Sequence, residues 1–581
     1  MWVAMKLITL PLLFAASAAL AQTVPPIPTD ADSGPAAKVA ETASYSAVVS
    51  AAQPLASEAG REILQKGGSA ADAAIATMLA LTVVEPQSSG IGGGGFLVYQ
   101  PAKGKLATID GREKAPAVAS PKQFLGDDGK PLPFAVAATG GRSVGVPGNL
   151  ALAAEAHKKW GKLPWATLFE PAIRLADQGF AVSPVMARLL QYGQEGLKKA
   201  GPGGRALYFD QNGAPLAAGT FFRNPELAAT LRTIARQGPK AFYRGEIADA
   251  IVKTVNTAEA NPTAMTKADL AAYRAKLRAP VCGAYRSYTI CGMGPPSSGG
   301  VGVLTMLKQL ERFDMKGLGK DNPVSWHLFA ESQRLAYADR DKWLGDADYV
   351  KVPVPGLIDP AYIAARSALI RADARIAKAE AGSPKGAPPR EAANDNEVAG
   401  TTHFAIADAA GNVASYTSTI ERTFGSGLIT GGFALNNELT DFNFDPADQG
   451  ALTANRVQPG KRPRSSMSPT IVYDKDGKVV LAIGAAGGTT IIAQVAKAVM
   501  GVIDWELDVQ SAIALPQLIA IGDRLAIEKG TILEDMAPAL SAMGHKPAAG
   551  ALPLKLNGVQ RTAGGWRGGA DPRGEGKPAG Y

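Results

Sequence analysis

The stretch NDNEVAGTTHFAIADAAGNVASYTST, residues 394–419, changes character partway along its length. Up to Gly400 it is polar and rich in small residues, which is typical of a loop. From Thr401 onward the segments THFAIAD and VASYTST alternate around the turn AAGN at 409–412, and this pattern predicts a β-hairpin. A strand is therefore expected to begin abruptly at Thr401.

The turn sets the register of this predicted hairpin. If Asp408 pairs with Asn412 or the residue after it, Thr401 lies opposite Thr419 or the residue after that. The hydroxyl of Thr419 would then lie within reach of the hydroxyl of Thr401. Threonine also favours strands for structural reasons, so the hairpin alone leaves that simpler interpretation open.

Composition narrows the class of protein. With 581 residues, 46% hydrophobic and 19% charged, the chain is typical of a globular protein with either several domains or one large α/β core. The net charge of +8 is spread along the chain, and no basic run is interleaved with aromatic residues, so we expect no nucleic-acid partner. Two cysteines and four scattered histidines predict neither a metal site nor a cofactor.

The first residues, 1–21, have the pattern of a signal peptide. Lys6 precedes an apolar run, and small residues at Ala19 and Ala21 predict cleavage after Ala21. The alternative, an N-terminal membrane anchor, needs a longer apolar run of roughly 20 residues. We therefore expect a periplasmic or secreted protein without a stable membrane span.

The two cysteines, Cys282 and Cys291, lie near the ends of a short predicted hairpin that turns around residues 283–287. In an oxidising compartment such a pair can form a disulfide.

A threonine hydroxyl is a weak nucleophile that needs a base close by. The four histidines are poorly placed to supply a Ser-His-Asp arrangement. If the chain is cut between Gly400 and Thr401, the new α-amine of Thr401 becomes available as that base. Such a cut would also explain why the strand begins so abruptly.

A nucleophile that attacks a carbonyl also needs donors for the developing oxyanion. In AIGAAGGTTII, residues 482–492, Gly487 and Gly488 stand where a predicted strand turns into a helix, so their N–H groups would lie at the positive helix terminus. A glycine pair that only permits close packing is the simpler alternative.

Seven motifs together resemble the γ-glutamyltransferases, also called glutathione hydrolases, and they occur in that family's order over almost the whole chain after the leader. They are SSGIGGGGF (88–96), IDGREKAP (109–116), PPSSGG (295–300), GTTHFAIADAAGN (400–412), RPRSSMSPTIV (462–472), GAAGG (484–488) and GADPRGEGKPAGY (569–581). The glycine loop alone resembles a phosphate cradle, but it does not stand before a nucleotide-binding helix.

The resemblance implies a fold and a processing step. The fold is α/β (α+β): a four-layer αββα sandwich with antiparallel sheets, the N-terminal-nucleophile hydrolase fold. The precursor would cut itself between Gly400 and Thr401, leaving residues 22–400 as large subunit and 401–581 as small, catalytic subunit. The two would stay together as a heterodimer that forms one αββα domain.

The resemblance also implies a γ-glutamyl pocket. Arg112, Ser465 and Ser466 match the positions that hold the α-carboxylate of the substrate. The α-ammonium would face Glu421, Glu438 and Asp441. Glu421 stands where better-known members have Asn, and the segment 443–460 looks shorter than the loop that covers the substrate in some members.

The implied activity is hydrolysis or transfer of the γ-glutamyl group of glutathione and related compounds. Thr401 would be the nucleophile, Thr419 would orient it, and Gly487 and Gly488 would stabilise the oxyanion. Water, or an amino acid or peptide, would accept the acyl group. Two alternatives remain: a cephalosporin (glutaryl) acylase-like amidase on the same fold, and a non-enzymatic binding protein that no longer cuts itself.

Overall fold

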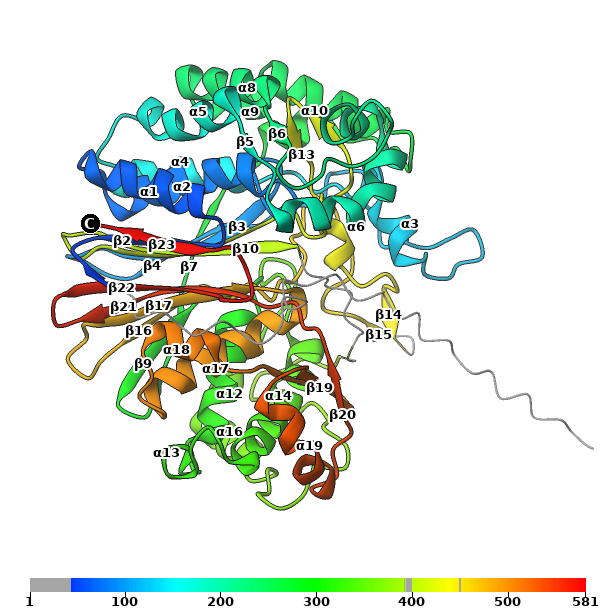
Figure 1. Cartoon of the computed structure of the whole chain (residues 1–581). Helices are drawn as coiled ribbons and strands as arrows, with labels where there is room; N and C mark the ends of the chain where they lie inside the picture. The colour runs from blue at the N-terminus through cyan, green and yellow to red at the C-terminus, as the bar shows by residue number, and fades with distance from the viewer. Residues whose placement is uncertain (1–42, 391, 393–399, 449–450) are drawn as a thin grey trace, which may run out of the picture.

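The computed structural model describes residues 43–390, 392, 400–448 and 451–581. Two seven-stranded sheets lie face to face, and helices cover the outer face of each (Figure 1). Strand pairing within both sheets is antiparallel. The predicted four-layer αββα sandwich is therefore confirmed, while the predicted signal peptide, 1–21, lies outside the described residues.

The upper sheet in Figure 1 contains the predicted hairpin at its centre. In spatial order its strands are β23 (Lys577–Gly580), β2 (Val48–Ala51), β10 (Thr401–Ala407), β11 (Val413–Thr419), β3 (Gly94–Gln100), β4 (Ala107–Gly111) and β7 (Lys276–Arg278).

The lower sheet carries the strand that leads into the glycine pair. In spatial order its strands are β1 (Ser44–Tyr45), β22 (Gly565–Ala570), β21 (Lys555–Thr562), β17 (Val479–Ala486), β16 (Thr470–Tyr473), β9 (Tyr288–Gly292) and β8 (Val281–Tyr285). A disulfide bond joins Cys282 of β8 to its cross-strand neighbour Cys291 of β9.

The two helical layers are formed by different parts of the chain. The upper layer contains α1 (Pro54–Gln65), α2 (Ala70–Val84), α4 (Asn149–Trp160), α5 (Glu170–Gln178), α6 (Pro184–Ala200), α8 (Pro225–Gln237), α9 (Lys240–Arg244) and α10 (Glu246–Asn256) (Figure 1). The lower layer contains α12 (Gly299–Leu310), α13 (Met315–Leu318), α14 (Pro323–Trp343), α16 (Pro360–Ser367), α17 (Ile491–Ile503), α18 (Val509–Ala514) and α19 (Ile532–Ala542).

Shorter elements fill the periphery. The helical ones are α3 (Phe134–Ala138), α7 (Pro202–Tyr208), α11 (Lys267–Ala271), α15 (Val354–Leu357) and the 3₁₀ turns η2 (Gly141–Ser143), η3 (Trp165–Phe169), η4 (Glu438–Asp441) and η5 (Gly488–Thr490). The small sheets are β5 (Phe180–Ala181) with β6 (Phe221–Phe222), β12 (Ile429–Thr430) with β13 (Phe433–Ala434), β14 (Ala447–Asp448) with β15 (Ala451–Leu452), and β18 (Leu518–Ile521) with β19 (Arg524–Glu528) and β20 (Pro547–Gly550).

Helix α2 shows how local sequence and burial combine. Its N-cap Ser69 and Asp72 form a reciprocal capping box, which satisfies backbone N–H groups that the helix leaves unpaired. Every residue of α2 is buried, in agreement with a sequence that is apolar nearly all round the helix. Within the described part of the chain, no helix is both long enough and apolar enough to cross a membrane.

The hairpin β10–β11 has the expected register. Thr401 pairs with Thr419, and Phe404 pairs with Tyr416. Because side chains alternate along a strand, Phe404 and Ile406 pack beneath the upper helices, whereas Ala405 and Ala407 face the core between the two sheets. Burial on both faces holds this register, since a slip of one residue would exchange the two sets.

Candidate functional site

Thr401 and Thr419 stand side by side at one end of the central hairpin. Their hydroxyl oxygens are 3.1 Å apart, with Thr401 donating to Thr419. The backbone N–H of Glu421 also donates to Thr419 Oγ1, at 2.8 Å, and the Thr419 hydroxyl donates to the carbonyl oxygen of Gly400, at 3.4 Å. Thr419 thus connects the Thr401 hydroxyl to the carbonyl that precedes Thr401.

Gly400 lies directly against the backbone that follows β11. A Cβ atom at this position would stand 2.0 Å from the carbonyl oxygen of Glu421, closer than any non-bonded contact allows. Glu421 itself has a φ of +77°, a conformation that costs a non-glycine residue free energy. The chain is therefore tightly confined on both sides of the Thr401–Thr419 pair.

The glycine loop before β3 packs against the same end of the hairpin. A Cβ atom at Gly93 would lie 1.9 Å from the carbonyl oxygen of Thr419, and one at Gly92 would lie 2.0 Å from that of Ala434. These glycines allow two backbones to approach closely. The glycines thus let the loop support the hairpin, and this role explains their position without a phosphate-binding function.

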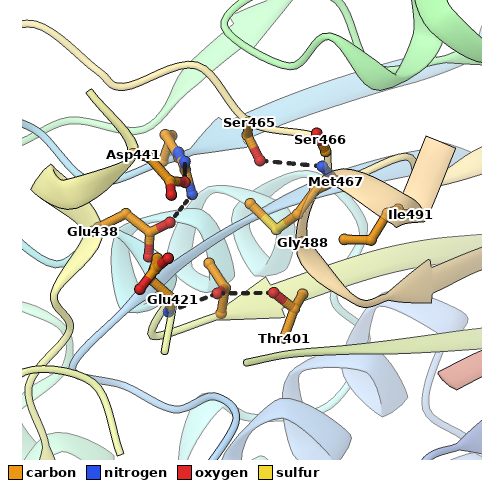
Figure 2. A pocket seen from close by; sticks show the side chains of 11 residues that line it. Thr401, Glu421, Glu438, Asp441, Ser465, Ser466, Met467, Gly488 and Ile491 are labelled. Atoms are coloured by element: carbon orange, nitrogen blue, oxygen red, sulfur yellow. Dashed lines mark hydrogen bonds and ion pairs between the residues drawn. The ribbon is translucent and has the colours of Figure 1, made fainter. Parts of the chain in front are cut away.

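A pocket with about 220 Å³ of empty space opens onto Thr401. It is lined by Arg112, Thr401, Thr419, Glu421, Glu438, Asp441, Ser465, Ser466, Met467, Gly488 and Ile491. Figure 2 shows Ser465 and Ser466 on one side, Glu421, Glu438 and Asp441 on another, and Thr401 below them. The structure thus brings together all the predicted substrate-binding residues, whereas Gly487 is not part of the lining.

Arg112, just after β4, is the central cation of the pocket. Its guanidinium donates to the carboxylates of Glu438 and Asp441, and to the carbonyl oxygens of Pro463 (3.2 Å) and Arg464 (2.8 Å). The family resemblance implies that Arg112 binds the substrate carboxylate and that the two acids face the substrate ammonium. In the structure these opposite charges pair with one another.

Glu113 is a buried acid for which the sequence alone predicts no role. Its side chain is 0% exposed, and a carboxylate oxygen lies 3.9 Å from Nη1 of Arg112. Burial raises the pKa of Glu113 from 4.5 to about 7. Burial also raises the pKa of Glu438 well above its ordinary value, although Arg112 opposes this shift.

Gly487 and Gly488 occupy the turn between β17 and α17. Both have positive φ angles, +137° and +59°, which side chains disfavour. Gly488 and Ile491 line the pocket at the start of α17, where the helix dipole is positive. The predicted strand-to-helix turn is present, and it faces the pocket through Gly488.

Two lining residues were missed by sequence analysis because they are apolar. Met467 and Ile491 carry no group that suggests chemistry, and only the pocket itself identifies them. Met467 lies within the RPRSSMSP motif, and Ile491 follows the GAAGG motif by three residues, so their place in the chain could have indicated them.

One further hydroxyl has the sequence spacing of a hydrolase nucleophile. Ser143 is the serine of GRSVG, residues 141–145, which fits the GxSxG pattern. It lies in the 3₁₀ turn η2, and its hydroxyl donates to the carbonyl oxygen of Ala138 at 2.9 Å. A nucleophile elbow needs a strand-to-helix turn, so Ser143 is a structural residue.

Comparisons with known proteins agree with this geometry. Residues 56–581 match the family model described as Gamma-glutamyltranspeptidase. The chain is 40% identical over 523 residues to a glutathione hydrolase proenzyme of Bacillus subtilis (strain 168), covering 88% of this chain and 87% of that protein. It is 38% identical over 511 residues to the glutathione hydrolase proenzyme of Escherichia coli (strain K12), covering 86% of each.

A solved structure supports the same grouping. The crystal structure of cephalosporin acylase from Bacillus halodurans superposes with a TM-score of 0.82 at 29% identity, covering 93% of this chain and 97% of the other. Fold, motifs and the relatives' sequences agree over most of the chain. The chain therefore belongs to the gamma-glutamyltranspeptidase family.

Proposed function

We propose that this protein is a self-cleaving γ-glutamyl hydrolase and transferase that acts on glutathione and related γ-glutamyl compounds. One observation carries the proposal: the Thr401 hydroxyl, 3.1 Å from that of Thr419, opens into a pocket lined by Arg112, two serines and three carboxylates. These groups suit an acyl donor that carries both a carboxylate and an ammonium.

The first step would be the cut between Gly400 and Thr401. Thr401 Oγ1 attacks the Gly400 carbonyl carbon, the peptide C–N bond breaks, and the hydroxyl proton passes to the nitrogen, which becomes the α-amine of Thr401. An ester joins Gly400 to Thr401 until water hydrolyses it. Support comes from Thr419, whose hydroxyl donates to the Gly400 carbonyl oxygen and would polarise it.

Thr401 would then act on substrates with its own α-amine as base. Its Oγ1 attacks the γ-carbonyl, the amine takes the hydroxyl proton, and the leaving amine departs with a proton. The acyl-enzyme ester is resolved by water or by the amine of an amino acid or peptide. Backbone N–H groups at Gly487 and Gly488 would stabilise the oxyanion, at roughly 3 kcal/mol per donor.

The two ends of the acyl group would occupy opposite sides of the pocket. Ser465 and Ser466, with Arg112, would hold the α-carboxylate, and Glu421, Glu438 and Asp441 would face the α-ammonium. Since Arg112 already pairs with Glu438 and Asp441, the substrate's two charges would enter an existing network of ion pairs.

The test is substitution at Thr401. Thr401→Ala should run as one band on a denaturing gel and should not hydrolyse a γ-glutamyl anilide, because both steps need the hydroxyl. The parent should give two bands, the smaller beginning at Thr401 by N-terminal sequencing. Two bands, or activity, from Thr401→Ala would contradict the proposal.

A matched control is the neighbouring Thr402, which is also buried and is absent from the pocket lining. Its Oγ1 makes no hydrogen bond among the described residues. Thr402→Val should therefore cut itself and retain the parent's activity, since it removes only an unsatisfied buried hydroxyl.

The acylase alternative is supported by the high structural similarity to the Bacillus halodurans cephalosporin acylase. Glutathione and a glutaryl amide, compared side by side at equal concentration, separate the two proposals. Faster hydrolysis of the glutaryl amide would favour the acylase.

We also propose that the protein is exported to the periplasm or secreted. The leader pattern at residues 1–21 supports this proposal. So does the disulfide between Cys282 and Cys291, because such bonds persist in oxidising compartments.

A further inference from the structure

The hydroxyl of Ser466 has a defined direction because of a buried arginine behind it. Arg340, on α14, is 1% exposed, and its Nη2 donates to Ser466 Oγ at 2.7 Å. A guanidinium has donors only. Ser466 therefore accepts this hydrogen bond, and its own proton is directed to a different acceptor.

The same guanidinium also fixes the backbone of the serine pair. Arg340 Nε donates to Ser298 Oγ at 2.9 Å, and Ser298 Oγ in turn donates to the carbonyl oxygen of Ser465 at 2.7 Å. The N–H of Ser298 donates to that carbonyl oxygen too, at 2.7 Å. The PPSSGG motif thus has a specific role, as the link between Arg340 and Ser465.

The second pocket hydroxyl is held in the same sense. The backbone N–H of Met467 donates to Ser465 Oγ at 3.1 Å (Figure 2). An N–H group cannot accept, so Ser465 also directs its proton to another acceptor. A hydroxyl that accepts from the protein donates its one proton elsewhere, and a donor of this kind suits a carboxylate, which only accepts.

We propose that Arg340 is a positioning residue that makes the Ser465–Ser466 pair a receptor for the α-carboxylate of the acyl donor. Arg112 is engaged by Glu438 and Asp441, whereas Ser465 Oγ and Ser466 Oγ each accept a hydrogen bond from a fixed donor of the protein. The proposal rests on the proposed function. It adds that discrimination for a carboxylate depends on a residue that never touches the substrate.

The experiment compares two anilides that differ only in this carboxylate: L-γ-glutamyl-4-nitroanilide and 4-aminobutanoyl-4-nitroanilide. Arg340→Gln should raise KM for the γ-glutamyl substrate by about tenfold or more, with kcat changed less than about threefold. The kcat/KM for the 4-aminobutanoyl substrate should stay within about twofold of the parent. Arg340→Lys, which keeps a donor, should recover part of the loss.

A double-mutant cycle tests, without the second substrate, whether Arg340 acts through Ser466. If Arg340 acts through Ser466, Arg340→Gln should add little to the KM of Ser466→Ala, so the two effects will not be additive. Additive effects, or equal loss on both anilides, would overturn the proposal. Should Arg340→Gln remain uncut or unfolded, Arg340→Lys and Ser298→Ala carry the same test with smaller expected shifts.

The matched control is Arg334, on the same helix and 2% exposed. It pairs with Glu331 and donates to the carbonyl oxygen of Gly522, away from the serine pair. Arg334→Lys should lower Tm about as much as Arg340→Lys without changing the ratio of the two KM values. Hydrolysis of the γ-glutamyl anilide by the parent tests the proposed function. The ratio of the two KM values separately tests the role of Arg340.

Discussion

Glu113 and Glu438 are buried acids that bind a proton more readily in the folded protein than in the unfolded chain. Their pKa values are raised, that of Glu113 to about 7, chiefly by burial. Between the unfolded pKa of 4.5 and this folded value, the native protein binds more protons than the unfolded chain. Stability contributed in this way is present at low pH and is lost as pH rises through the window.

Glu113→Gln removes one of these titrations while keeping the shape of the side chain. We expect the fall of Tm between about pH 5 and pH 8 to become shallower in this variant, because the neutral amide has no charge to bury. Thermal unfolding over that range checks it. The exposed Glu226→Gln is the control and should keep the parent's slope; an identical slope in Glu113→Gln would contradict the assignment.

For individual residues, the sequence predicts those contacts that depend only on neighbouring segments of the chain. The pairing of Thr401 with Thr419 follows from the length of one turn, and the structure has it. Glu113, Met467 and Ile491 were missed, because their burial depends on elements far away in the chain. The ion pairs of Arg112 with Glu438 and Asp441 were missed for the same reason.

Among the elements, the glycine loop before β3 has a strict steric requirement. Gly93→Ala would place a methyl group 1.9 Å from the Thr419 carbonyl oxygen, so the loop or the hairpin end must move. We expect Tm to fall by several degrees and self-cleavage to slow at least tenfold, as a shift at Thr419 disturbs the geometry that aligns Thr401.

The time course of cleavage on denaturing gels and the Tm measure both effects. Gly550→Ala is a suitable control, because a Cβ atom there meets nothing within 4 Å. Normal cleavage by Gly93→Ala would show that the loop does not position Thr419.

Helices and strands differ in how far the sequence predicts them. Helix α2 and its Ser69 cap are encoded within one short segment, so they are predictable. The neighbours of the hairpin are not, since β10 pairs with β2 and β11 with β3, both more than 300 residues earlier in the chain. The αββα arrangement was expected through resemblance to a family and not through periodicity.

At the scale of the molecule, the proposed cut divides two chains that share both sheets. In the upper sheet, β10 and β11 lie between β2 and β3; in the lower sheet, β22, β21, β17 and β16 lie between β1 and β9. In each sheet, these strands of 401–581 are thus flanked on both sides by strands of the preceding chain, and the edge strand β23 adds a further pairing with β2. Separation of the two chains would break hydrogen-bonded ladders in each sheet.

We therefore expect the two chains to stay together after cleavage. They should co-elute on native size exclusion, in low and in high salt, and separate only in denaturant, because backbone hydrogen bonds and buried apolar surface hold them. Elution as two species in native buffer would contradict this arrangement of strands. Thr401→Ala, expected to remain one chain, is the reference for the elution volume.

Because the strands are interleaved, cleavage of the Gly400–Thr401 bond also changes how the protein refolds. While the bond is intact, folding is unimolecular; once it is cut, an unfolded molecule becomes two partners whose reunion depends on concentration. The lifetime of the mature protein is then governed by its rate of unfolding and not by an equilibrium. Heating and cooling should retrace one another better for uncut Thr401→Ala than for the cleaved parent, whose recovery should fall on dilution.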